Sequence, residues 1–220
     1  MSVRRSLIPL ALALFAVRCS DNIGPPPAPA LHFLQWAGSA PPQFTAIGAL
    51  SGGLGKRVLA APVGQLSLNQ YTASFWAVRG EQRSLQINYL SYTGDTSSQF
   101  LRLTTVDPAY VPGVGDLAPG DSVLITVTVD PYNIAVSLEP TGLLFGAPAE
   151  LQLSYGGADG DLNGDGVVDE TDAYIESQLL GLWYREGTDS AWGRIPAVQS
   201  LPDKSFTSAL PHFCQYAVSW

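Results

Sequence analysis

Charged residues and cysteines are scarce in this sequence of 220 residues. Lys, Arg, Asp and Glu together make up 14% of it, and cysteine occurs twice. Two cysteines cannot supply the disulfide framework of a small secreted scaffold. The formal net charge of −8 argues against nucleic acids and anionic membrane surfaces as binding partners. The two histidines, His32 and His212, do not stand at metal-binding spacing from another histidine or cysteine, so the sequence contains no conventional zinc motif.

The sequence patterns of common enzyme classes are also missing. There is no Gly-x-Ser-x-Gly elbow, no phosphate-cradling loop and no dinucleotide-binding fingerprint, so we do not predict an enzyme. A pair of acidic residues suited to glycoside hydrolysis remains an open alternative. Five tryptophans could line a sugar-binding face, although core packing is the expected use of most of them. They are Trp36, Trp76, Trp183, Trp192 and Trp220.

An apolar run near the N-terminus, residues 7–17, has eleven residues and is too short to span a bilayer comfortably. Two arginines precede it, and this combination is typical of a secretory signal, which we place at residues 1–18. Cys19 follows at once, and the arrangement resembles a bacterial lipoprotein signal. That resemblance implies lipidation of Cys19, while ordinary secretion remains the alternative. Residues 19–30 are rich in proline and predict an extended linker.

From Leu31 onward apolar and polar residues alternate, as they do in half-buried strands. The clearest strands are predicted at 71–78, 84–90 and 121–129. A turn at 79–81 separates the first two, which predicts a hairpin. Turn signals recur about every ten residues, and this spacing is typical of an antiparallel β-sandwich.

The stretch 161–172 reads DLNGDGVVDETD and places oxygen-bearing side chains at loop positions 1, 3, 5, 9 and 12. Calcium takes six to eight oxygen ligands, and this spacing folds one short segment around such an ion. Gly166 stands at position 6, where a calcium loop turns sharply, and Val167 at position 7 needs only its backbone carbonyl. The predicted Ca²⁺ ligands are Asp161, Asn163, Asp165, Val167, Asp169 and Asp172. The alternative is an acidic turn that binds nothing.

These residues resemble the repeat of dockerins, the EF-hand-like modules of secreted cellulose-degrading assemblies. Asp172 stands where the usual EF-hand has Glu, as in the dockerin variant. The resemblance implies calcium ligation; cohesin docking is not implied, because dockerins carry two repeats and the sequence has one copy. Asp169 can cap a following helix with Asp172 as its third residue. Apolar residues then recur at helical spacing as far as Trp183, so we predict a helix that continues toward Gly187.

A second resemblance lies in the C-terminal part. Glu139-Pro140 through Phe145, together with His212, Phe213 and Tyr216, are similar to the β-sandwich domain of zona-occludens and netrin-receptor proteins. Some relatives of that domain cleave themselves at a His-Phe-Ser strand. The resemblance implies Cys214 as the nucleophile on the Phe213 carbonyl, as a remote alternative to a purely structural strand. If Cys19 is not lipidated, a Cys19–Cys214 disulfide is possible on spacing alone.

The sequence therefore predicts a mainly β protein, an antiparallel sandwich with one inserted calcium loop and α-helix. We expect an immunoglobulin-like region at 31–115 and a C-terminal sandwich at 116–220, with the loop and helix inserted at 156–190. The predicted protein binds calcium, is secreted or lipid-anchored at the bacterial cell envelope, and has a binding or scaffolding role. Its partner would be a protein or glycan at the cell surface, with membrane contact only through the lipid anchor. The alternative is an accessory protein or hydrolase of polysaccharide degradation, tied to dockerin-type assemblies.

Overall fold

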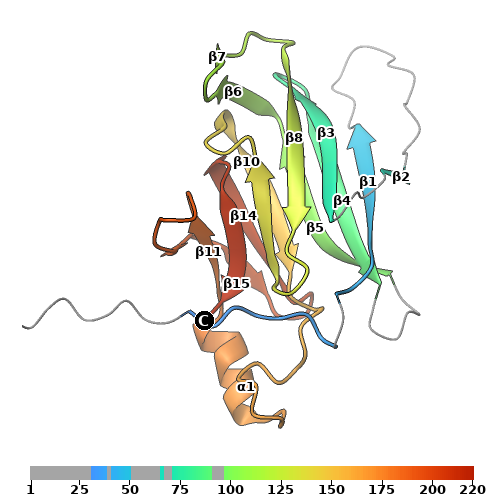
Figure 1. Ribbon diagram of the computed structural model, residues 1–220, viewed down its shortest axis with the longest axis vertical. Helices are drawn as coiled ribbons and strands as arrows, with labels where there is room; N and C mark the ends of the chain where they lie inside the picture. The colour runs from blue at the N-terminus through green and yellow to red at the C-terminus, as the bar shows by residue number, and fades with distance from the viewer. Residues whose placement is uncertain (1–30, 39–40, 51–64, 67–70, 91–96) are drawn as a thin grey trace, which may run out of the picture. The chain divides into compact units, whose positions relative to one another are not determined.

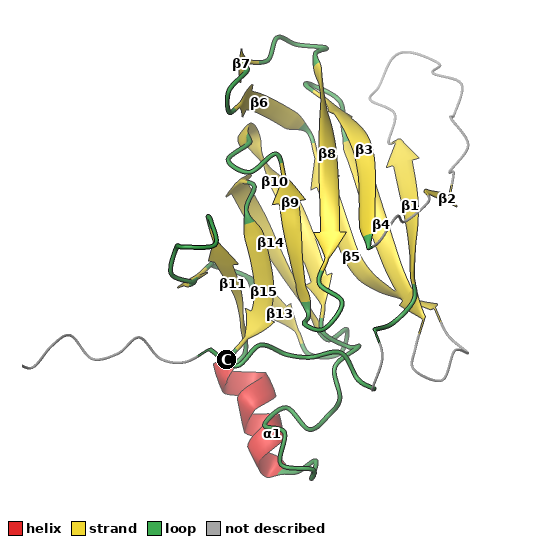
Figure 2. Cartoon of the chain, viewed as in Figure 1, coloured by secondary structure: helices red, strands yellow, loops and turns green. Residues whose placement is uncertain are grey.

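The strands form two antiparallel sheets that pack face to face, as Figures 1 and 2 show, which confirms the predicted β-sandwich. The computed structural model describes residues 31–38, 41–50, 65–66, 71–90 and 97–220. Residues 31–220 form one compact unit. The predicted signal peptide, Cys19 and the proline-rich linker lie outside the described residues.

The larger sheet has nine strands, arranged in the order β13-β14-β10-β5-β4-β1-β2, with β6 pairing β10 and β7 pairing β6. Its strands are β1 (Phe44–Leu50), β2 (Gln65–Leu66), β4 (Arg83–Leu90), β5 (Ser97–Thr105), β6 (Asp107–Val111), β7 (Gly115–Asp116), β10 (Leu144–Ser154), β13 (Val198–Ser200) and β14 (Ser205–His212). The smaller sheet has six strands in the order β12-β11-β15-β9-β8-β3. Its strands are β3 (Thr72–Val78), β8 (Ser122–Val129), β9 (Ala135–Glu139), β11 (Gly181–Arg185), β12 (Gly193–Arg194) and β15 (Gln215–Ser219).

The core lies between the two sheets and is filled by the inward side chains of their strands. Every second residue of β8 from Val123 to Val129 is buried, as the sequence predicts. Leu85 and Ile87 of β4 face the same core from the other sheet and are fully buried. Full burial of one such side chain contributes roughly 1.5–3 kcal/mol, so the period-two pattern is what stabilises the sandwich.

The predicted hairpin between residues 71–78 and 84–90 is wrong. β3 pairs with β8 in the smaller sheet, while β4 pairs with β1 and β5 in the larger one. The turn is present, with Gly80 at φ +87°, but it carries the chain from one sheet to the other. A hairpin within one sheet and a crossing between two sheets both need a turn here, so the turn does not decide between them. The strand partners decide it, and those of β3 are distant in sequence: the hydroxyls of Ser74 on β3 and Thr126 on β8 lie 2.9 Å apart.

The expected division into regions 31–115 and 116–220 does not separate two compact units. β3 from the first region pairs with β8 from the second, and β5 pairs with β10. Each sheet therefore contains strands from both regions, and strands of one region form backbone hydrogen bonds with strands of the other. The boundary at 115/116 falls within β7, a short strand that pairs with β6.

The acidic loop and helix lie between β10 and β11, as expected, but the helix is shorter than predicted. α1 spans Glu170–Tyr174 and continues as a π-helical segment, η1, over Ile175–Leu179. Residues Gly181–Arg185 then form β11, because Leu182 is fully buried between the sheets and pairs with Val218. Helical spacing of apolar residues from Ile175 to Leu182 thus arises from a helix followed directly by a strand.

Candidate metal centre

The acidic loop is a closed turn organised by the carboxylate of Asp161. Its Oδ1 accepts the backbone N–H groups of Gly164 and Asp165 at 2.8 and 3.1 Å, and its Oδ2 accepts that of Gly166 at 2.7 Å. Gly164 and Gly166 have φ values of +77° and +89°, which side-chain-bearing residues rarely adopt. The sharp turn predicted at Gly166 is therefore confirmed, and Asp161 is its centre.

Asn163 and Asp165 are brought next to each other by the same turn. The Nδ2 of Asn163 donates to the Oδ2 of Asp165 at 3.0 Å, and the Oδ1 of Asn163 accepts the Asp165 N–H at 2.9 Å. The Oδ1 of Asp165 accepts the N–H of Val167 at 2.9 Å. The first four predicted ligand positions, 161, 163, 165 and 167, are thus joined by direct hydrogen bonds.

The second half of the loop begins the helix. Asp169 is the N-cap, and its carboxylate accepts the N–H of Thr171 at 2.7 Å. Asp172 at the third helical position accepts the N–H of Asp169 at 2.9 Å, which completes a capping box. The predicted cap by Asp169 and Asp172 is therefore confirmed.

Asp172 also has a role that sequence reasoning missed. Its Oδ1 accepts the N–H groups of Leu162 and Asn163 at 2.7 and 3.2 Å, so the carboxylate joins the end of the loop to its beginning. The residue is only 3% exposed. The hydrogen bond from the Asp169 N–H, followed by those from Leu162 and Asn163, lowers the pKa of the Asp172 carboxyl and keeps it ionised. Spacing alone gives position 12 as a ligand, whereas here it is also the latch that closes the loop.

The donor chemistry fits a hard cation. The stretch 159–172 contains six acidic residues and no lysine or arginine. None of the ion pairs among the described residues involves the loop. In the described part of the chain, no three His, Cys, Asp or Glu side chains converge into a metal-type cluster. Asp161 Oδ2, Asp165 Oδ1 and the Asn163 amide oxygen each accept a single loop N–H, so each keeps a second lone pair for another partner.

The π-helical segment attaches the loop and helix to the sandwich. Ile175 and Leu180 are each 2% exposed, and the Leu180 N–H donates to the Ile175 carbonyl at 2.9 Å, the i to i−5 bond of a π-helix. The carbonyl of Glu176 accepts the side-chain amide of Gln199 at 2.9 Å. That amide also donates to the Tyr155 hydroxyl at 3.0 Å, and burial raises the pKa of Tyr155 to about 12. The carboxylate of Glu176 lies 3.6 Å from Lys204, so the segment is fixed at several points.

The residues of the self-cleavage alternative are arranged as core. Phe213 is fully buried, and its carbonyl accepts the N–H of Gly142 at 2.8 Å. Cys214 is 1% exposed, and burial raises the pKa of its thiol to about 11, which opposes formation of the nucleophilic thiolate. His212 Nε2 lies 3.9 Å from a carboxylate oxygen of Glu186. These contacts favour the structural role of the strand.

The tryptophans have mixed environments and do not form one face. Trp36 is buried at 7% exposure, and its Nε1 donates to the Asp130 carbonyl at 3.0 Å. Trp76 is 55% exposed, on the outer face of β3. The other three are partly buried, and Arg185 lies over the Trp192 ring, 4.8 Å from its centroid. We expected most tryptophans to be core residues, but of the five only Trp36 is buried.

The fold and the loop together define the chain as an antiparallel β-sandwich with an acidic loop and helix between two strands. No family model matches it, and neither a curated protein nor a solved structure is similar enough to count as a match. Among the described residues, no helix has the length and apolar character needed to cross a membrane.

Proposed function

We propose that residues 161–172 bind one calcium ion. The observation that supports this most is the hydrogen-bonded closure of an all-oxygen loop: the Asp172 carboxylate joins position 12 to positions 2 and 3. Asp161, Asn163, Asp165, Asp169 and Asp172, with the Val167 carbonyl, would hold the ion. When bound, calcium supplies positive charge that offsets the mutual repulsion of the carboxylates.

The chain's own contacts would preorganise this site. Backbone N–H groups of the loop already orient Asp161 and Asp165, so little side-chain freedom remains to be lost on binding. The loop also contacts the sandwich directly, because the Trp220 indole donates to the Leu162 carbonyl at 3.3 Å. Calcium would therefore stabilise the loop and helix as part of the folded unit rather than as a separate module.

We further propose that the protein is secreted or lipid-anchored through Cys19 at the bacterial cell envelope and has a binding or scaffolding role there. The signal-like residues 1–18 and the proline-rich linker support this location. The filled core between the two sheets supports binding at the surface rather than catalysis in a cleft. A protein or glycan of the cell surface is the partner class that we expect.

Thermal unfolding tests the calcium proposal. A ligand that binds only the folded state adds about 2.7 kcal/mol of stability at a hundredfold excess over Kd. For a domain of this size, this raises Tm by roughly 5–10 °C, and chelator should reverse the rise. Asp165→Ala should remove the calcium-dependent rise. Asp189→Ala, at an exposed acid outside the loop, is the matched control and should keep it. The proposal fails if Asp165→Ala responds to calcium as the unaltered protein does.

A further inference from the structure

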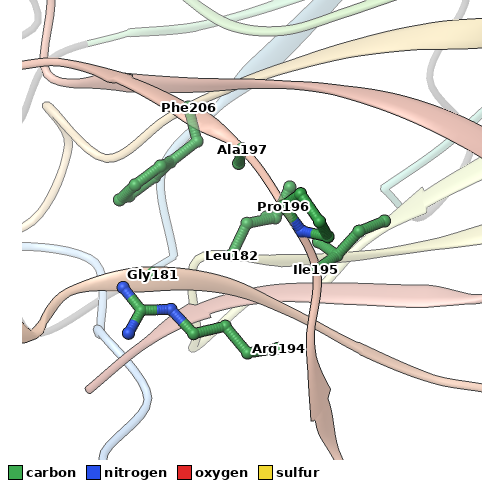
Figure 3. Close-up of a pocket in the computed structure, with 7 residues that line it drawn as sticks. All are labelled: Gly181, Leu182, Arg194, Ile195, Pro196, Ala197 and Phe206. Atoms are coloured by element: carbon green, nitrogen blue, oxygen red, sulfur yellow. The ribbon is translucent and has the colours of Figure 1, made fainter.

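A pocket of about 360 Å³ opens at the side of the sandwich, and none of the residues that line it belongs to the acidic loop (Figure 3). Its apolar floor comes from both sheets: Leu182 belongs to β11 and is fully buried, and Phe206 belongs to β14 and is 3% exposed. The connection 195–197 runs from β12 at the edge of one sheet to β13 at the edge of the other and forms the wall. The volume is at the lower end of the range for small-molecule sites.

Arg194 is the charged residue among those that line this pocket. Within the part of the chain that the structure describes, its guanidinium donates one hydrogen bond, from an Nη to the carbonyl of Leu180 at 2.9 Å. No carboxylate of the described residues lies within ion-pair distance of it. A guanidinium carries five N–H donors in a planar fork, so most of the donors of Arg194 remain for another acceptor. Arg194 is exposed, so these donors are open to solvent and to a ligand at the mouth of the pocket.

Gly181 makes room for the guanidinium. A Cβ at this position would lie 2.5 Å from Nε of Arg194 and 2.9 Å from its Cζ, which is closer than real contacts allow. Gly181 lies in a strand and has no left-handed φ, so a side chain at this position would not strain the backbone but would displace the end of the Arg194 side chain. Figure 3 shows the guanidinium next to Gly181 and the Phe206 ring on the opposite side of the open space.

We propose that this pocket binds a small organic carboxylate with a compact apolar body. The apolar body would lie against Ile195, Pro196 and Ala197, above the buried side chains of Leu182 and Phe206. The carboxylate would pair with the planar fork of Arg194, the geometry in which arginine recognises carboxylates best. Polyanions and sugars suit the pocket poorly, because Arg194 is alone in charge and the remaining walls are apolar side chains.

Titration with three probes, followed by ¹H–¹⁵N spectra of the labelled protein, tests this proposal. Phenylacetate has both the ring and the charge, 2-phenylethanol has the ring alone, and acetate has the charge alone. Phenylacetate should shift the amides of residues 181, 182, 194, 195, 197 and 206. It should bind at least tenfold more tightly than either of the other probes.

Two variants and a control complete the test. Arg194→Gln should weaken phenylacetate binding at least tenfold. Gly181→Ala leaves the charge in place but displaces the flexible end of Arg194, and it should weaken binding as well, which keeps the test valid should Arg194→Gln fail to fold. Arg102→Gln, at an exposed arginine on β5, should change nothing. Equal affinities for phenylacetate and phenylethanol, unaltered binding in either pocket variant, or no shifts at these amides would overturn the proposal.

Discussion

The indole Nε1 of Trp220 donates a hydrogen bond to the carbonyl oxygen of Leu162, with 3.3 Å between the two atoms. Leu162 is the second residue of the acidic loop, and Trp220 directly follows β15 in the smaller sheet. The ring of His32 stacks on the Trp220 ring at 4.4 Å. A fluorescent side chain that the sandwich holds in place therefore touches the proposed calcium loop.

This contact predicts that terbium, a calcium substitute with oxygen-ligand preferences, will emit light when tryptophan is excited. Trp220→Phe should reduce the sensitised emission, because energy transfer falls steeply with distance, while leaving terbium affinity close to that of the unaltered protein. Trp76→Phe is the control. Trp76 lies on β3, three strands from β15 in the same sheet, which corresponds to roughly 14 Å at the usual strand spacing. Equal losses of emission in the two variants would argue against a metal at this loop.

The latch formed by Asp172 predicts a pH dependence that does not need calcium. Its carboxyl has a lower pKa in the folded state than the ordinary value of 3.8. A group of this kind contributes stability that is present above pH 3.8 and is lost as the pH falls through the lower folded value. In chelator, Asp172→Asn should therefore unfold at lower urea concentration than the unaltered protein at neutral pH. This difference should shrink as the solution is acidified below 3.8.

Asp189→Asn serves as the control for this series, because Asp189 is an exposed acid outside the loop. Its midpoint should follow that of the unaltered protein at every pH. An Asp172→Asn protein whose stability matches the unaltered protein in chelator would show that the three N–H contacts of this carboxylate do not stabilise the fold.

Removal of calcium should loosen the loop and helix but leave the sandwich folded. Residues 156–180 contain the acidic loop, α1 and η1, and their buried contacts are few compared with those of the central strands. Hydrogen exchange should therefore increase in this segment on chelation and stay nearly constant in β8. A uniform increase through both would show instead that the ion is required for the whole fold.

Much of the fold could be predicted because a strand that buries one face has apolar and polar residues in alternation. The alternation in β8 gave its four buried valine and isoleucine side chains directly. Strand partners could not be found in this way. The residues around Gly80 would make a turn in a hairpin as well as in a crossing between sheets, and β3 pairs with β8, whose residues are about fifty positions away. Leu182 satisfies helical spacing from Ile175, so its place in β11 became evident only from its pairing with Val218.

The loop was predictable to the level of single residues since its chemistry is local. Asp161, Gly166 and the cap formed by Asp169 all follow from spacing within twelve residues. The closure by Asp172 onto Leu162 is nearly as local, but the spacing pattern does not reveal it, since the same spacing predicts Asp172 as a calcium ligand. The pocket at Arg194 gave no signal in the sequence, because it depends on Phe206 and Gly181 from different sheets.

Calorimetric titration of the metal-free protein with calcium tests the central proposal most directly. One calcium ion should bind per chain, and magnesium should bind much more weakly, because it demands stricter octahedral geometry than a flexible oxygen loop provides. Asp161→Ala and Asp165→Ala should each abolish or strongly weaken the binding, while Asp189→Ala should bind as the unaltered protein does. Absence of calcium-dependent heat in the unaltered protein, or undiminished binding in Asp161→Ala and Asp165→Ala, would contradict the assignment of residues 161–172 as a calcium site.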